Sequence, residues 1–306
     1  MRVLITDSDN RSALASTRAL GVGGHTVITA GDRHPSLASV SRYSSGSEIY
    51  PNPVSDPDGF VSAVVEIAQR QRIDVVLPMT EITTLLLTQN QSALPSGCQL
   101  PFPAPEVVSN ASNKAYVMTA ARALGVPIPE TTIVESLAEV EALAATLSYP
   151  AVMKASRSRV RTPSGWISTG VGYANDRSAF VAAMKKLRPE EYPILVQERI
   201  YGPGVGVFAC FDRGAPLAWF NHRRIREKPP SGGVSVLRES APLDPIAVDY
   251  ANRLLSHLGW RGVAMVEFKR DNRDGSLRLM EINGRFWGSL QLAIDAGVDF
   301  PSMLVG

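Results

Sequence analysis

The stretch Leu279-Met280-Glu281-Ile282-Asn283-Gly284-Arg285 is the most informative part of this sequence. An apolar segment with a single acid, Val266-Glu267-Phe268-Lys269, precedes it. Asp274-Gly275 lies between the two and is a strong signal for a tight turn. The pattern therefore predicts a β-hairpin with strands over residues 263–269 and 276–282.

The acids of this hairpin form a candidate metal site. If the two strands pair, Glu267 and Glu281 can lie close together on one face, and Asn283 follows Glu281 on the same face because side chains alternate along a strand. Carboxylate and amide oxygens are hard ligands that suit Mg²⁺, whereas two close carboxylates without a cation would repel each other. Two unrelated acids in solvent are the alternative interpretation, since any hairpin can carry them.

The first hundred residues alternate short apolar segments with helical patterns. Strands are predicted over residues 2–6, 26–30 and 74–77, and helices over residues 12–20, 60–71 and 81–90. Gly21 is expected to end the first helix. Alternation of this kind is typical of a parallel sheet with helices on both faces.

The rest of the chain has a different, mixed pattern. Residues 155–170 are interpreted as a long polar loop. Helices are predicted over residues 112–124, 137–147, 176–187 and 245–258. Strands are predicted over residues 131–134 and 151–154, and antiparallel strands over residues 194–199, 205–212, 215–223 and 234–239.

Composition excludes several classes of protein. The 306 residues carry 31 Lys and Arg against 29 Asp and Glu, a net charge of +2, which gives no bulk attraction to nucleic acid or anionic membranes. A hydrophobic fraction of 44% excludes a mainly disordered chain, and two cysteines are too few for a disulfide scaffold. No uncharged stretch is apolar enough to span a bilayer, so we expect a cytoplasmic α/β protein.

Glycine-containing stretches invite a nucleotide-binding interpretation. Gly21-Val22-Gly23-Gly24 follows a predicted helix and not a strand, which argues against a dinucleotide fingerprint and a Rossmann-type dehydrogenase. Residues 162–172 follow a predicted strand and a segment that holds three arginines. Their small residues would let backbone N–H groups approach phosphate oxygens, but a solvated, mobile surface loop fits the same composition.

A local basic run covers residues 221–233 and includes Arg223 and Arg224. A guanidinium binds carboxylates and phosphates through two parallel hydrogen bonds, and Ser231-Gly232-Gly233 would let the backbone approach a substrate. A solvated hairpin face is the alternative. Nucleic-acid binding is disfavoured because no aromatic residues are interleaved for stacking.

Several of these stretches, in this order, resemble the ATP-grasp superfamily. The similarity is to its carboxylate–amine ligases, which are related to the ATP-binding part of the carbamoyl-phosphate synthase large chain, and it covers nearly the whole sequence. It rests on Asn113-Lys114, Lys154, the loop over residues 162–172, Leu195-Val196-Gln197-Glu198-Arg199-Ile200, and Glu267 with the stretch that ends at Arg285.

The resemblance implies an ATP site. Lys114 and Lys154 would hold the phosphates, and the loop over residues 162–172, with Ser164 and Gly165, would close over them as a lid. The residues implied around adenine are Gln197, Glu198, Ile200 and Met280. Residues 197–200 would form the hinge beside adenine. Relatives often carry an acid after this hinge, and that acid holds the ribose. This sequence has none there, so Glu198 is the candidate substitute.

The resemblance also implies a metal site and catalytic arginines. Mg²⁺ would bind to Glu267, Glu281 and Asn283. Arg285 would face the transferring phosphoryl group, and Arg223 or Arg224 would meet the acyl phosphate or the substrate carboxylate.

The fold implied is a Rossmann-like pre-ATP-grasp domain over residues 1–112, followed by an ATP-grasp module over residues 113–306. The module would combine a small α+β lid subdomain over residues 125–192 with a larger subdomain of mixed and antiparallel sheet over residues 193–306. Relatives usually continue beyond residue 306, so the resemblance implies a truncated or shortened chain.

The function implied is that of an ATP-dependent ligase. A substrate carboxylate attacks the γ-phosphate of Mg-ATP, and an amine then displaces phosphate to give an amide or peptide bond. The expected partners are small-molecule acids and amines, amino acids among them, with a homodimer as a further option and no nucleic acid or membrane. An ATP-binding regulatory or structural protein without turnover is the alternative.

Overall fold

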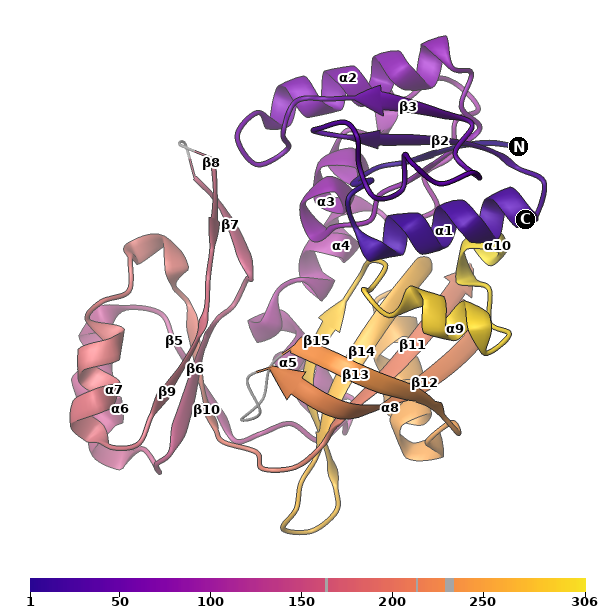
Figure 1. The fold of residues 1–306 in the computed structure, drawn as a ribbon. Helices are drawn as coiled ribbons and strands as arrows, with labels where there is room; N and C mark the ends of the chain where they lie inside the picture. Colours follow the sequence, from indigo (N-terminus) through magenta and orange to yellow (C-terminus); the bar gives the residue numbers. More distant parts are fainter. Residues whose placement is uncertain (163–164, 213, 229–233) are drawn as a thin grey trace. The chain divides into compact units, whose positions relative to one another are not determined.

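The computed structural model describes residues 1–162, 165–212, 214–228 and 234–306. The chain forms two compact units. Residues 1–109, 206–265 and 283–306 make up unit 1, and residues 110–205 and 266–282 make up unit 2. Figure 1 follows the chain through its helices and strands.

Unit 1 begins with a parallel four-stranded sheet in the order β3-β2-β1-β4. Its strands are β1 (Arg2–Ile5), β2 (Thr26–Gly31), β3 (Gly46–Ile49) and β4 (Val75–Leu77). Helices α1 (Arg11–Val22), α2 (Pro57–Arg70) and α3 (Glu81–Gln89) follow β1, β3 and β4 along the chain. The predicted parallel sheet is confirmed, and the side chains of Val3, Leu4 and Ile5 are fully buried, as expected for a strand covered on both faces.

The prediction that Gly21 ends the first helix is wrong. Helix α1 continues to Val22, and Gly24, with φ of 80°, lies just beyond its end. Gly21 has a packing role instead, because a Cβ at this position would lie 2.6 Å from Cβ of Tyr43. The glycine therefore allows the chain around Tyr43 to approach the helix closely.

Two further strands and three helices of unit 1 come from later parts of the chain. They are β12 (Ala215–Lys228), β13 (Val234–Ala241), α8 (Pro245–His257), α9 (Leu290–Asp295) and α10 (Phe300–Val305). Helices α9 and α10 both contact α1, so the last helices of the chain pack against the first one (Figure 1).

A five-stranded sheet has the order β13-β12-β11-β14-β15. It includes β11 (Gly204–Asp212), β14 (Gly262–Arg270) and β15 (Leu277–Asn283). β14 and β15 are neighbours in this sheet, which confirms the hairpin predicted around Asp274-Gly275.

Unit 2 contains a four-stranded sheet in the order β5-β10-β6-β9, in which every pairing is antiparallel. The strands are β5 (Thr131–Val134), β6 (Ala151–Ala155), β9 (Val171–Ala174) and β10 (Ile194–Glu198). Helices α6 (Val140–Thr146) and α7 (Arg177–Met184) contact each other and cover one face (Figure 1). Apolar side chains from this face, among them Met153, Val196 and Phe180, form the core of the unit.

The predicted polar loop over residues 155–170 is in part a hairpin. Strands β7 (Arg159–Thr162) and β8 (Gly165–Ser168) pair there, with Val160 opposite Ile167 and Arg161 opposite Trp166. The charged arginines led to the interpretation as a loop. Val160, Trp166 and Ile167, however, are residue types that favour strands.

The remaining elements are short. They are α4 (Pro105–Ala111), α5 (Lys114–Ala123) and the 3₁₀ helices Gln91–Ala93, Leu137–Glu139 and Pro189–Glu191. Among the residues that the structure describes, no helix is both long and apolar enough to cross a membrane.

Candidate functional site

Lys114 is placed by the start of helix α5. Asn113 caps this helix, and its side-chain oxygen accepts hydrogen bonds from the amides of Ala115 (3.0 Å) and Tyr116 (3.3 Å). The amide of Lys114 donates to the carbonyl of Ser156 at 2.7 Å, which fixes the helix start beside the end of β6. Asn113-Lys114 is thus a local structural signal as well as a family motif.

The ammonium group of Lys114 has two polar partners, which come from distant segments of the chain. Its Nζ donates to Oγ of Ser158 at 2.8 Å and lies 3.5 Å from Oε2 of Glu281 on β15. The Lys114 side chain is only 11% exposed, so water screens this ion pair less than one at the surface.

Lys154 lies on β6 between core residues. Its neighbours Met153 and Ala155 belong to the core beneath α6 and α7, so alternation directs Lys154 to the opposite face of the sheet. Burial lowers the pKa of Lys154. The positive charge of Lys114 also lowers this pKa, whereas the negative charges of Glu281 and Glu267 raise it. Two lysines and two glutamates predicted from the sequence therefore lie together in unit 2.

The two glutamates are the candidate ligands for a divalent cation. The charges of both carboxylates raise the pKa of Lys154. This is expected for two side chains that share one face of the β14–β15 hairpin. Asn283 lies two residues beyond Glu281 on β15, and its Oδ1 accepts a hydrogen bond from Nη2 of Arg285 at 3.3 Å. Over the described part of the chain, no group of three or more His, Cys, Asp and Glu side chains is arranged to hold a metal.

The hinge implied over residues 197–200 is held by hydrogen bonds within unit 2. The side chain of Gln197 is buried and donates to Oγ1 of Thr131 at 2.9 Å. The amide of Glu198 donates to the carbonyl of Glu130 at 3.0 Å, and the carbonyl of Ile200 accepts from Nζ of Lys269 at 3.3 Å.

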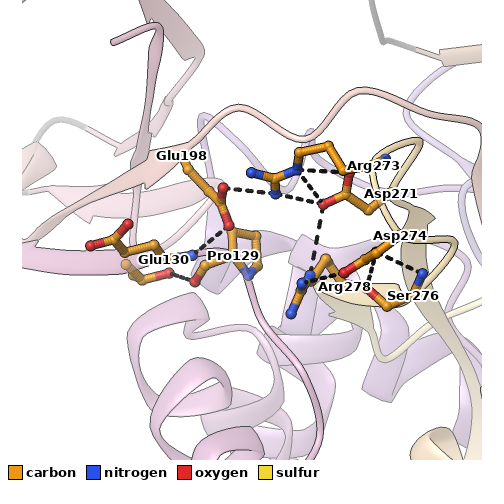
Figure 2. A network of polar contacts seen from close by, with 9 residues as sticks. Pro129, Glu130, Glu198, Asp271, Arg273, Asp274, Ser276 and Arg278 are labelled. Carbon is orange, nitrogen blue, oxygen red and sulfur yellow. Dashed lines mark hydrogen bonds and ion pairs between the residues drawn. The ribbon is translucent and has the colours of Figure 1, made fainter. Parts of the chain in front are cut away.

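The carboxylate of Glu198 is held on both of its oxygens (Figure 2). Oε1 accepts from the amide of Glu130 at 3.1 Å, and Oε2 lies 2.8 Å from Nη2 of Arg273. Arg273 also donates from Nε to both carboxylate oxygens of buried Asp271, each at 3.0 Å. Glu198 is thus oriented towards the β14–β15 turn, and holding a ribose would require these contacts to be exchanged.

The segment after the hinge is bound to the same turn. The amides of Arg270 and Asn272 donate to the carbonyls of Pro203 (3.0 Å) and Tyr201 (2.8 Å). Gly202, with φ of 153°, passes so close that a Cβ would lie 1.8 Å from the carbonyl oxygen of Arg270. Only glycine allows this approach.

The proposed lid is described in part. Ser164 lies outside the described residues, as does Ser231-Gly232-Gly233. Gly165 begins β8 with φ of 115°, and its carbonyl accepts from Oγ1 of Thr162 at 3.0 Å. Met280, the last of the residues implied around adenine, is half-buried on β15.

The predicted arginines lie in unit 1. Arg223 is exposed and donates from Nε to Glu239 at 2.7 Å, whereas Arg224 is half-buried on the other face of β12. Arg285 donates from Nη1 to the carbonyl of Phe286 at 2.8 Å. His222 packs against the ring of Phe208 with centroids 4.7 Å apart, which agrees with a structural role.

Sequence reasoning missed Ser158, Lys269 and Arg273. Lys269 follows Glu267 by two positions on β14, so strand alternation would have indicated that both side chains share a face. No sequence signal links Lys114 to Ser158 or Glu198 to Arg273, because these contacts depend on how distant segments meet.

Comparison with known proteins matches the last part of the chain to a family model. Residues 190–306 match the model of a family described as ATP-grasp in the biosynthetic pathway with Ter operon. No curated protein sequence matches the chain.

Solved structures share the fold across almost the whole chain. L-amino acid ligase from Bacillus licheniformis is 19% identical with a TM-score of 0.73, over 99% of this chain and 73% of that one. The biotin carboxylase domain of 2-oxoglutarate carboxylase from Hydrogenobacter thermophilus, solved with MgADP, ADP and bicarbonate, is 17% identical with a TM-score of 0.77, over 99% and 68%. N5-carboxyaminoimidazole ribonucleotide synthetase from Thermotoga maritima is 15% identical with a TM-score of 0.67, over 99% and 75%. The predicted fold class is confirmed.

Proposed function

With its ATP-grasp fold as the premise, we propose that this chain is an ATP-dependent ligase that joins a carboxylate to an amine. The carboxylate oxygen attacks the γ-phosphorus of ATP, and ADP leaves with the electrons of the broken bond. The amine nitrogen then attacks the acyl carbon and loses a proton, and phosphate leaves. The products are an amide or peptide bond, ADP and phosphate.

One observation carries this proposal: Lys114, Lys154, Glu267 and Glu281 lie together although they come from four different elements. Two ammonium groups are suited to phosphate oxygens, and two carboxylates are suited to Mg²⁺. Such a site offers positive groups to the phosphates of a nucleoside triphosphate and negative groups to its cation.

Each residue has a defined part in the proposed site. Lys114 and Lys154 bind the phosphates and neutralise charge that develops during transfer. Glu267, Glu281 and Asn283 would hold Mg²⁺, and the ion would supply positive charge that stabilises the phosphate groups. Arg285 and Arg224 would orient the acyl phosphate and the carboxylate. Arg224 is preferred to Arg223 because its side chain is half-buried, whereas that of Arg223 is exposed.

Adenine is proposed to lie at the end of β10. The Glu198 amide already donates to Glu130, so the carbonyl of Glu198 and the amide of Ile200 are the groups proposed for its edge. Gln197 supports the strand through Thr131, and Met280 would pack on the purine face.

ADP release, measured with pooled amino acids and small acids as substrates, tests the function. Glu281→Gln is expected to lower turnover by at least about a hundredfold, since charge stabilisation at such sites contributes about 10²–10³ in rate. Glu135→Gln, an exposed acid on the same unit, is the matched control and should retain activity. Near-normal turnover in Glu281→Gln would contradict the assignment of Glu281 to the Mg-ATP site. ATP binding without ADP release would instead favour a regulatory or structural nucleotide-binding protein.

A further inference from the structure

Lys269 connects two parts of the proposed nucleotide site. It lies on β14 two positions beyond Glu267, so alternation along the strand places both side chains on the same face. Its Nζ donates to the carbonyl of Ile200 at 3.3 Å in a partly buried environment, and Ile200 itself is only 5% exposed. A lysine on the face of a candidate metal ligand therefore holds a backbone group of the hinge.

Backbone contacts keep the hinge carbonyl next to this lysine. The amide of Arg270 donates to the carbonyl of Pro203 at 3.0 Å. The amide of Asn272 donates to the carbonyl of Tyr201 at 2.8 Å. All of these residues belong to unit 2, and the bonds join the segment after the hinge to the end of β14. The contact made by Lys269 is therefore part of a fixed arrangement.

Bonds within the protein determine which hinge groups can meet a base. Glu198 and Ile200 each have one backbone amide and one carbonyl. The amide of Glu198 donates to the carbonyl of Glu130 at 3.0 Å, and the carbonyl of Ile200 accepts from Lys269. The groups proposed above for adenine are the other two, the carbonyl of Glu198 and the amide of Ile200. Along the chain they present an acceptor and then a donor.

This order suits adenine and opposes guanine. Adenine has a donor at its 6-amino group and an acceptor at N1, whereas guanine has an acceptor at O6 and a donor at N1. Guanine in the position of adenine would set acceptor against acceptor at Glu198 and donor against donor at the Ile200 amide. A shift by one group would place O6 at this amide and N1–H at the carbonyl of Ile200. Lys269, which has donors and no acceptor, already occupies that carbonyl.

We propose that Lys269 is a positioning residue that makes the site selective for ATP over GTP by occupying the carbonyl of Ile200. The inference rests on the ligase function proposed above and deepens it, because it concerns the nucleotide of the same site. A guanine that shifted along the hinge would have to displace the ammonium group or leave its own N–H groups without an acceptor, which is costly in a buried site. Selectivity thus comes from rejection of the wrong base.

Base recognition is tested without turnover. Calorimetry with Mg²⁺ measures the affinity of the full chain for AMP-PNP and for GMP-PNP, whose β–γ bonds are not hydrolysed. The wild type should bind AMP-PNP at least about tenfold more tightly. Lys269→Met should strengthen GMP-PNP binding by about tenfold to a hundredfold, the range expected for one charged hydrogen-bonded group. Its affinity for AMP-PNP should change by less than about threefold.

Three further variants accompany Lys269→Met. Lys269→Ala also removes the donor and should shift the ratio of the two affinities in the same direction. Lys269→Arg keeps a donor at this position and should keep the wild-type ratio. Lys186→Met, an exposed lysine of the same unit, is the matched control and should change neither affinity.

The ratio of affinities isolates base recognition, because a merely structural role of Lys269 would weaken both nucleotides alike. An unchanged ratio in Lys269→Met and Lys269→Ala, or a wild type that binds both nucleotides equally, overturns the inference. Release of ADP and GDP from ATP and GTP then separates it from the ligase function. Turnover that uses ATP and GTP equally overturns the inference and leaves the ligase function standing. A ratio that depends on Lys269, without turnover of any substrate, overturns the ligase function alone, and a wild type that binds neither nucleotide overturns both.

Discussion

Arg273 holds the carboxylate of Glu198, with Nη2 of the arginine 2.8 Å from Oε2 of the glutamate. The second oxygen of Glu198 accepts from the amide of Glu130, so neither oxygen is directed by the protein towards a sugar (Figure 2). The position that the sequence suggested for a ribose contact is thus part of a network that joins the hinge to the β14–β15 turn.

We therefore expect little discrimination against 2′-deoxyATP. A site built to bond a substrate hydroxyl rejects the analogue that lacks it by about 10⁴–10⁵, but here kcat/KM for ATP and 2′-deoxyATP should agree within about threefold. Arg273→Gln releases one oxygen of Glu198, and the preference for ATP should rise. A wild-type preference for ATP above about a hundredfold would contradict the arrangement.

The pH dependence of the protein's stability should reflect the ionisation of Asp271. Hydrogen bonds from Arg273 lower the pKa of this carboxyl below its ordinary value of 3.8, although burial opposes them. A group with a lowered folded-state pKa stabilises the protein above the unfolded value and loses this effect as the pH falls through the folded value. Asp271→Asn should therefore melt a few degrees below the wild type at pH 7, and the difference should shrink below about pH 4. A difference that is constant from pH 7 to pH 3 would exclude an ionised Asp271 as its cause.

Lys154 should be unfavourable for stability and required for function. Its pKa is lowered mainly by burial, so the unfolded chain binds more protons and wild-type stability rises with pH up to the ordinary lysine value of 10.5. Lys154→Met should raise the thermal midpoint by about 2 °C at pH 7, with a smaller gain at higher pH. The same change should weaken ATP binding at least tenfold by calorimetry, roughly the loss of one charged contact. Lys186→Met, at an exposed position, should alter neither quantity; a destabilised Lys154→Met would contradict the account.

Two glycines of unit 2 offer a matched test of the hinge. Gly202→Ala places a Cβ against the carbonyl of Arg270 and should destabilise the protein by about 1–3 kcal/mol in urea unfolding. Gly170 has nothing within 4 Å of a built Cβ and no positive φ, so Gly170→Ala should be close to neutral. Equal effects of the two substitutions would show that the hinge can relax away from the turn.

The parts of the fold that sequence predicted are those with local signals. Asp274-Gly275 predicted the β14–β15 hairpin, and strand–helix alternation predicted the parallel sheet. Strand β3 was missed because Gly46-Ser47-Glu48-Ile49 has no apolar alternation, and β2 supplies its pairing. Local pattern is insufficient where a neighbouring strand determines the conformation.

The candidate site likewise has features that local sequence signals predict and features that depend on tertiary contacts. The alternation of Glu281 and Asn283 is local, and the sequence indicated it. Asn113 caps α5 through a local contact as well, but the sequence analysis named it only within the family resemblance. The pairing of Glu198 with Arg273, far apart in the sequence, depends on tertiary packing, so a role based on sequence position alone put Glu198 at the ribose. The resemblance to a family supplied the link between Lys114, Lys154 and the hairpin acids, which no spacing in the sequence predicts.

The packing of α9 and α10 on α1 has a consequence for protein synthesis. Helix α1 leaves the ribosome on the order of tens of seconds before its covering helices, at translation rates of about 5–20 residues per second. Its buried side chains, Ala13, Ala15 and Leu20 among them, lack part of their final cover in the nascent chain. Ribosome-bound chains arrested before residue 290 should therefore be cut by protease within residues 11–22 faster than the finished protein, and equal rates would show that the N-terminal sheet matures on its own.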